Sequence, residues 1–159
     1  MRFDDWILAL HVLSAFALIA GLVLFSALVV VGRRIDTPDA TIALNPLGKV
    51  GSATVGAGMI GTIVFGVWLA FSVGNYDIWD GWIIAAIVLW LVGAALGRKT
   101  GEAYMEGPTK AAELQSAGQN GPNEELLALN RTSRGLTLHL LTSLVALLIL
   151  IDMIWKPGA

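Results

Sequence analysis

Four long apolar segments constrain the fold of this chain more than any other feature. They cover approximately Trp6–Gly32, Gly51–Val73, Trp79–Gly97 and Gly135–Trp155, and charged residues occur only near their ends. Each is close to or above the ~20 residues that a helix needs to cross the ~30 Å hydrocarbon core of a bilayer. A transmembrane barrel would need ~10-residue segments of alternating polarity, and these are not found. The pattern predicts an all-α membrane protein, a bundle of four transmembrane helices in a single domain over residues 1–159.

The composition agrees with a chain that is surrounded by lipid. Of 159 residues, 56% are hydrophobic and 14% are charged, and a soluble domain of this length has too little interior to bury so much apolar surface. The net charge of −2 argues against nucleic acid as a partner. The absence of cysteine excludes disulfides, thiolate metal sites, iron–sulfur clusters and cysteine nucleophiles.

Basic residues predict the orientation of the four segments. Eight of the ten lysines and arginines lie between segments one and two or between segments three and four: Arg33, Arg34, Lys49, Arg98, Lys99, Lys110, Arg131 and Arg134. Cytoplasmic loops carry such an excess, so both termini should lie outside and the protein should be a multi-pass protein of the plasma membrane. Five tryptophans, Trp6, Trp68, Trp79, Trp82 and Trp155, fall near the predicted outer face, as an interfacial belt would.

The loops suggest how the segments are connected. The short outer turn at about residues 74–78 predicts a tight antiparallel pair of segments two and three. Pro38 and Pro46 predict an irregular first inner loop. The second inner loop, about residues 98–134, contains few large apolar residues, so we expect a solvated connector and not a domain.

Within the second inner loop, local signals predict two helical stretches. Pro108–Ala117 has a helical composition, and the following Gly118–Pro122 is a helix breaker. Asn123 should then cap a helix that has Glu124 and Glu125 in its first turn and that could continue into segment four.

Small residues recur every four positions along segment two. They are Thr54, Gly58, Thr62, Gly66 and Ala70. This spacing places them on one helix face, where they let two helix backbones approach closely in lipid. We expect this face to pack inside the four-helix bundle, and formation of a homodimer is the alternative.

The two histidines are the most informative polar residues inside the segments. His11 lies about five residues inside the outer end of segment one and could ligate haem or a metal, carry protons, or be structural. His139 lies about five residues inside the cytoplasmic end of segment four, with Thr142 and Ser143 one turn later, which favours a structural histidine bonded to a hydroxyl. The two should be ~15 Å apart along the membrane normal, too far to share one ion.

Two residues of segment four are expected at the depth of His11. Met153 could supply a second, soft ligand to haem iron, and Asp152 could orient the His11 imidazole or could simply be solvated at the interface. The sequence therefore predicts a candidate cofactor site of His11, Asp152 and Met153, in which His11 is the metal ligand.

The run Leu10-His11-Val12-Leu13-Ser14-Ala15, with Trp6 before it and Gly21 after it, resembles the first helix of the CopD/HemJ-like group of bacterial membrane proteins. The glycine-rich second segment and the terminal stretch Ile151–Ala159 are similar to an uncharacterised family within this group. For the HemJ type, the resemblance implies haem b, a functional histidine at His11 and protoporphyrinogen oxidase activity. For the CopD type, it implies copper uptake.

The sequence departs from both types. The HemJ type uses a lysine in a later helix, and no lysine lies within any of the four segments here. With no cysteine, two separated histidines and four methionines, a copper path is poorly supplied.

Three functional hypotheses follow. The first is a haem- or porphyrin-associated membrane protein that uses His11, and the second is a non-catalytic accessory or scaffold subunit that docks a second copy or another membrane protein. The third is a copper or ion transporter, which ranks last because transporters show charged or broken helices at mid-membrane. Hydrolase or transferase chemistry is not expected, since no acid–base pair or nucleophile is embedded in the segments.

Overall fold

The computed structural model describes residues 3–72, 77 and 79–156, and within them it contains six helices and no strand. Four helices are long: α1 (Phe3–Gly32), α3 (Asn45–Ser72), α4 (Gly81–Ser116) and α6 (Ser133–Trp155). Two are short, α2 (Pro38–Ala43) and α5 (Glu124–Asn130). Four segments are long and apolar enough to cross a membrane. The predicted all-α bundle of a multi-pass membrane protein is confirmed.

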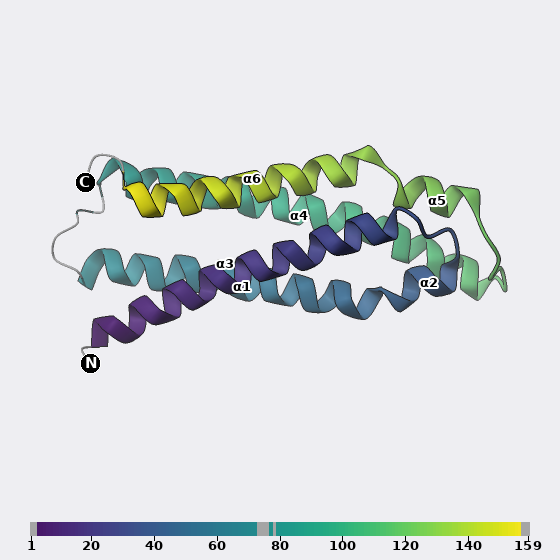
Figure 1. Ribbon diagram of the computed structural model, residues 1–159, viewed down its shortest axis with the longest axis horizontal. Coiled ribbons are helices and arrows are strands. Elements are labelled where there is room, and N and C mark those ends of the chain that lie inside the picture. Colours follow the sequence, from purple (N-terminus) through teal and green to yellow (C-terminus); the bar gives the residue numbers. More distant parts are fainter. Residues whose placement is uncertain (1–2, 73–76, 78, 157–159) are drawn as a thin grey trace.

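The two ends of the bundle differ in structure and in charge. The start of α1 and the end of α6 lie toward one end of the bundle, which we call the terminal end, and α2 and α5 lie at the other, the capped end (Figure 1). The cluster of basic residues that flanks α1, α3 and α6 belongs to the capped end. That the capped end faces the cytoplasm remains a prediction from this charge asymmetry.

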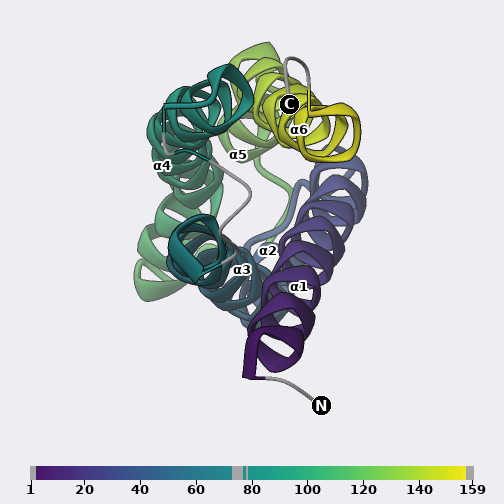
Figure 2. The ribbon, with the colours of Figure 1, turned by 90° about the vertical axis from the view of Figure 1, so that its left-hand side faces the viewer.

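The long helices are arranged as two antiparallel pairs. Helix α1 packs along α3 and α4 packs along α6, whereas contacts of α3 with α4 and of α1 with α6 are sparse (Figures 1 and 2). The expected tight pairing of segments two and three was therefore wrong, although they are consecutive in the sequence. The turn on which that expectation depended lies almost entirely outside the described residues, and α3 has its closest approach to α1 instead.

Glycines bring the backbones of α1 and α3 together. A Cβ atom on Gly58 would lie 2.8 Å from both the Cα of Leu18 and the carbonyl oxygen of Ser14. A Cβ on Gly21 would lie 2.9 Å from the backbone nitrogen of Val55. These neighbours are backbone atoms, which cannot rotate away. The small-residue face of α3 thus packs inside the bundle, as the sequence predicted.

The α4–α6 pair is built around larger side chains. Gly93 of α4 faces Val145, and Trp82 is only 7% exposed, with Lys156 Nζ 5.4 Å from its ring centroid. The prediction that Trp82 belongs to the interfacial belt was wrong, because its ring is used in packing. The other four tryptophans assigned to the belt, Trp6, Trp68, Trp79 and Trp155, are exposed as expected.

The two prolines of the first inner loop begin helices. Pro38 opens α2, and Pro46 lies in the first turn of α3. Proline is tolerated there because a first-turn N–H has no partner within the helix and the fixed φ suits the helical conformation. The prediction of an irregular loop was wrong for this reason, and only Leu44 separates the two helices.

Helix α4 continues past its apolar part, through Pro108, to Ser116. Gly118 (φ 74°) then ends it, with the Gln119 N–H donating to Leu114 O at 2.9 Å. The cap by Asn123 is confirmed, since its side chain accepts from Leu126 N at 2.9 Å. Helix α5 does not continue into α6, because the chain turns between Asn130 and Ser133.

The second inner loop folds against the bundle and is not a solvated connector. Ala111 and Leu126 are 0% exposed, and together with Leu114 they form a small core on which Ile42 packs. Polar contacts close this core: Asn123 N donates to Asp36 O at 2.8 Å. Lys110 of α4 and Glu125 of α5 form a 2.9 Å ion pair. The loop was misjudged because its few apolar residues are brought together by non-local packing.

The close approach of α1 and α3 generates the first prediction. Gly58→Ala should lower the free energy of unfolding by about 1–3 kcal/mol, because the new methyl group meets fixed backbone atoms. The measurement is thermal unfolding in one detergent. The matched control is Gly56→Ala, where a Cβ meets nothing within 4 Å; this change should be neutral or stabilise by up to ~1 kcal/mol through helix propensity. Equal effects of the two changes would contradict the packing account.

A second prediction concerns orientation. Alkaline phosphatase fused after Ala159 should be active, because this enzyme needs export to fold, and the same enzyme inserted between Gly118 and Gly121 should be inactive. Activity at the inserted position with none at the C-terminus would reverse the orientation.

Candidate functional site

His11 lies in the interface between α1 and α3. A Cβ on Gly66 would lie 3.0 Å from His11 Cε1 and 3.2 Å from His11 Nδ1, so the imidazole fills the space that the glycine leaves. The imidazole also makes a hydrogen bond with the backbone of Thr62, while Nδ1 is buried and has no partner among the described residues. Because N–H groups inside a helix are already bonded, Nε2 is the donor and the Thr62 carbonyl the acceptor. Nδ1 then carries the free lone pair.

A free lone pair opposite a nitrogen that donates to a carbonyl is the pattern of a metal-ligating histidine. The space around His11 does not match that pattern. An iron would have to lie ~2 Å from Nδ1, with a flat macrocycle around it, where Gly66 already contacts the ring. Eight residues earlier in α3, Gly58 is in contact with the backbone of Leu18 in α1. Haem does not fit at His11 unless α1 separates from α3.

Asp152 and Met153 lie on the other helix pair. Both are half-buried near the end of α6, and Asp152 Oδ2 is buried with no hydrogen-bond partner among the described residues. The start of α1 and the end of α6 diverge at the terminal end (Figure 2). No interaction between described residues joins His11 to either of them, so the structure does not assemble the three predicted site residues into one site.

His139 is the most buried polar side chain of the spans, at 3% exposure. Its Nε2 lies 2.8 Å from Ser26 Oγ of α1. The partner is therefore a hydroxyl, as the sequence suggested, but it comes from another helix and not from Thr142 or Ser143. Ser26 lies 15 residues, or about 22 Å of helix, from His11, which confirms that the two histidines cannot share an ion.

A serine and a histidine at this distance also raise the question of nucleophilic catalysis. Ser26 Oγ donates to Leu22 O at 3.0 Å. A serine has one proton, so both contacts coexist only when His139 Nε2 donates to Ser26, which leaves Nδ1 as the free lone pair. His139 then cannot act as a base toward Ser26. Ser26 also lies within α1, where backbone N–H groups are bonded and cannot form an oxyanion hole. The pair joins two helices and is not a catalytic dyad.

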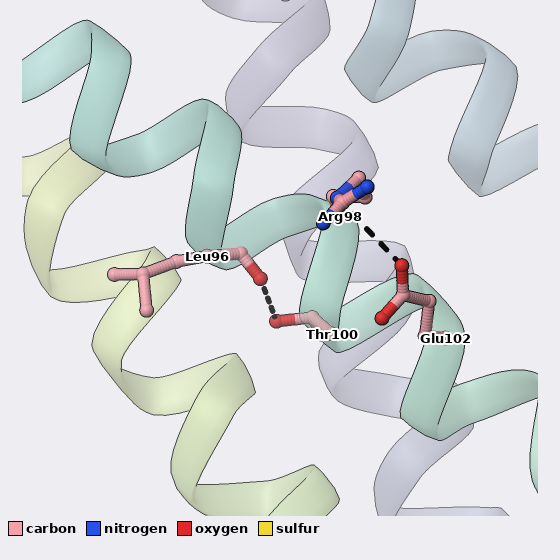
Figure 3. A network of polar contacts seen from close by, with 4 residues as sticks. All are labelled: Leu96, Arg98, Thr100 and Glu102. Atoms are coloured by element: carbon pink, nitrogen blue, oxygen red, sulfur yellow. Dashed lines mark hydrogen bonds and ion pairs between the residues drawn. The ribbon is translucent and has the colours of Figure 1, made fainter.

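Thr142 extends this connection to α4. Its Oγ1 lies 3.0 Å from Thr100 Oγ1, and each hydroxyl also bonds the carbonyl four residues earlier in its own helix. Figure 3 shows Thr100 and Leu96 on α4, next to the exposed ion pair of Arg98 and Glu102. One face of α6 thus reaches α1 through His139 and α4 through Thr142. Nearer mid-membrane, Trp90 Nε1 of α4 donates to Met59 O of α3 at 3.1 Å.

A cavity of about 70 Å³ lies at the capped end, where α1, α2, α4 and the α5–α6 junction meet. Its polar lining residues are Arg33, Thr41, Thr100, Tyr104, Asn130 and Thr132. Asn130 Nδ2 donates to Ile35 O at 3.0 Å and so ties α5 to the end of α1. Ligand pockets usually occupy about 300–1,000 Å³, so this cavity suits water molecules and not a substrate.

A larger, open groove of about 480 Å³ lies on the outside of the cap. It is lined by Asn45, Met105, Pro108, Thr109, Ala112, Glu113 and Ser116. Met105 is 45% exposed, although it lies seven residues, or about 10 Å of helix, beyond Arg98 and thus outside the apolar part of α4.

Comparisons with protein-family models, with curated proteins and with solved structures find no match to this chain. Among the residues that the structure describes, no group of three or more His, Asp or Glu side chains could hold a metal ion. The sequence analysis missed Ser26. A signal was present, because Ser26 continues the row of His11, Leu18 and Leu22 at helical spacing, but only the tertiary arrangement identifies His139 as its partner.

The connection between α1 and α6 can be tested directly. Ser26→Ala removes the hydroxyl from a buried imidazole and should lower the free energy of unfolding by about 0.6–1.7 kcal/mol, from the average to the maximum found for hydrogen bonds between membrane helices. Thermal unfolding is the measurement. Ser143→Ala removes a hydroxyl that the sequence favoured as the partner of His139, and it should lower stability less than Ser26→Ala does. A larger loss in Ser143→Ala would contradict the assignment of Ser26 as this partner.

Proposed function

We propose that this protein is a non-catalytic membrane subunit that docks a second membrane protein through its cap. The groove on the cap is the observation that carries the proposal. It exposes Met105 beside Pro108 and Ala112 outside the predicted hydrocarbon region, where lipid tails do not cover apolar surface.

The groove's lining suggests which chemistry a partner would present. Glu113 is its one charged lining residue, and the remaining side chains are apolar or small and polar. A partner segment with an apolar side chain against Met105 and a basic side chain near Glu113 would be complementary. The rigid cap supports such a role, since an interface on preordered elements loses little entropy on binding.

The interior of the bundle supports the same proposal by a separate argument. The hydroxyl and indole groups shared between spans connect one helix to another, as Ser26, Thr142 and Trp90 do. The Nδ1 atoms of His11 and His139 are buried and have no hydrogen-bond partner among the described residues, and the His11 ring fills the space beside Gly66. This use of polar groups favours a structural role over a haem-associated oxidase or an ion path.

The test is extraction from native membranes into polymer-bounded nanodiscs, followed by mass determination and an absorption spectrum before and after dithionite. We expect a discrete particle heavier than one chain, with no Soret band. Met105→Lys should release the second component, because it places a charge in the groove, whereas Glu124→Lys on exposed α5 should not.

Other outcomes would replace the proposal. A Soret band that is lost in His11→Ala would establish the haem hypothesis and would mean that α1 and α3 separate to admit the cofactor. A single chain with a flat visible spectrum would contradict both hypotheses. A particle that contains only a second copy of this chain would assign the groove to a homo-oligomer.

A further inference from the structure

Helices α1 and α6 are joined only over a short length near the capped end. Ser26 and His139 form the deeper contact. At the end of α1, Arg33 Nη1 donates to Thr132 O at 3.3 Å, and Arg131 Nε donates to Arg33 O at 3.2 Å. Beyond these contacts the two helices diverge toward the terminal end (Figures 1 and 2). Beside the Ser26–His139 bond, two arginine side chains thus join the end of α1 to the α5–α6 junction.

The side chain of each arginine bonds the backbone at or next to the other, and neither forms an ion pair with a carboxylate of a described residue. The ion pairs between described residues involve Arg98, Lys110 and Arg134, and none involves Arg33 or Arg131. Each guanidinium has five N–H donors, and the contact described above uses one of them. Arg33 is half-buried and Arg131 is exposed. An anion bound to both side chains would offset their like charges.

The position of the pair in the membrane identifies the class of anion. Arg33 directly follows Gly32, the last residue of the apolar helix α1, and Ser133 begins α6 beside Arg131. Both guanidiniums therefore lie at the boundary between hydrocarbon and water, where lipid phosphates are found. Basic pockets between transmembrane helices at this level bind anionic head groups, and a planar guanidinium matches a phosphate in bidentate fashion.

We propose that Arg33 and Arg131 bind the phosphate of an anionic phospholipid in the leaflet at the capped end. The phosphate bridges the end of α1 and the α5–α6 junction and so strengthens the sparse α1–α6 contact. The acyl chains lie along the exposed apolar surface of α1 and α6, where Val30 and Leu140 are 59% and 58% exposed. This site does not depend on the proposed docking function.

The experiment uses the full chain in nanodiscs of phosphatidylcholine, with or without phosphatidylglycerol at constant total lipid. The measured quantity is the increase in unfolding temperature that phosphatidylglycerol produces. We expect a clear increase for the wild type, which becomes smaller at high salt because the contact is electrostatic. Arg131→Gln should lose most of this increase, and Arg131→Lys should keep part of it, since it retains the charge but not the bidentate geometry.

Arg98→Gln is the matched control. Arg98 has the same charge at the same end of the bundle, and its exposed side chain is paired with Glu102 at 3.6 Å. This variant should keep the lipid-dependent increase. Because each variant is compared with itself in the two lipids, a general loss of stability does not enter the result.

Three results would overturn the proposal. The first is a wild type that responds equally to both lipid compositions. The second is an equal loss in Arg98→Gln and Arg131→Gln, which would indicate a diffuse response to surface charge. The third is the same increase from inorganic phosphate in pure phosphatidylcholine, which would assign the site to the free anion.

Discussion

The backbone contact between α1 and α3 is the interaction on which the rest of the structure depends. In lipid there is no hydrophobic force between apolar helices, so association relies on close packing. Gly21 and Gly58 bring the two backbones so near that a single added carbon would meet main-chain atoms. This contact fixes where α1 lies, and therefore also where His11 and Ser26, on the same helix, are placed. His11 lies against α3 in the tight interface, and Ser26 lies farther along, where α1 approaches α6.

Contacts between the two helix pairs are few, and two hydrogen bonds supplement them: Ser26 with His139 and Trp90 with Met59. Unpaired polar groups are costly in hydrocarbon, so each such bond also specifies which faces meet. Leu126 and Pro38, the largest fully buried side chains, lie in the cap, where the short helices α2 and α5 contact α4.

This distribution guides the functional proposals. Among the described residues, His11 fills the space beside Gly66 between α1 and α3, and His139 joins α6 to α1 through Ser26. The accessible chemistry lies instead at the capped end, in a groove with an exposed methionine and in two arginines without a carboxylate. Both features suit association, one with a protein segment and the other with a lipid phosphate.

The class of fold could be predicted from the amino-acid pattern, because hydropathy over ~20 residues is a local property that decides whether a helix is stable in lipid. The amino-acid pattern also determined the cap at Asn123 and the break at Gly118, which depend on residues close together in the chain. Only the tertiary structure decided that α3 pairs with α1, that Trp82 is packed inside, and that His139 bonds Ser26. The row of small residues on α3 predicted that another helix would pack on this face. It did not predict which helix, because any span with matching small residues could pack there. The separation of His11 from Asp152 and Met153 also depends on tertiary structure. Residues at the same depth in the membrane lie in one plane, but they contact each other only if their helices are neighbours.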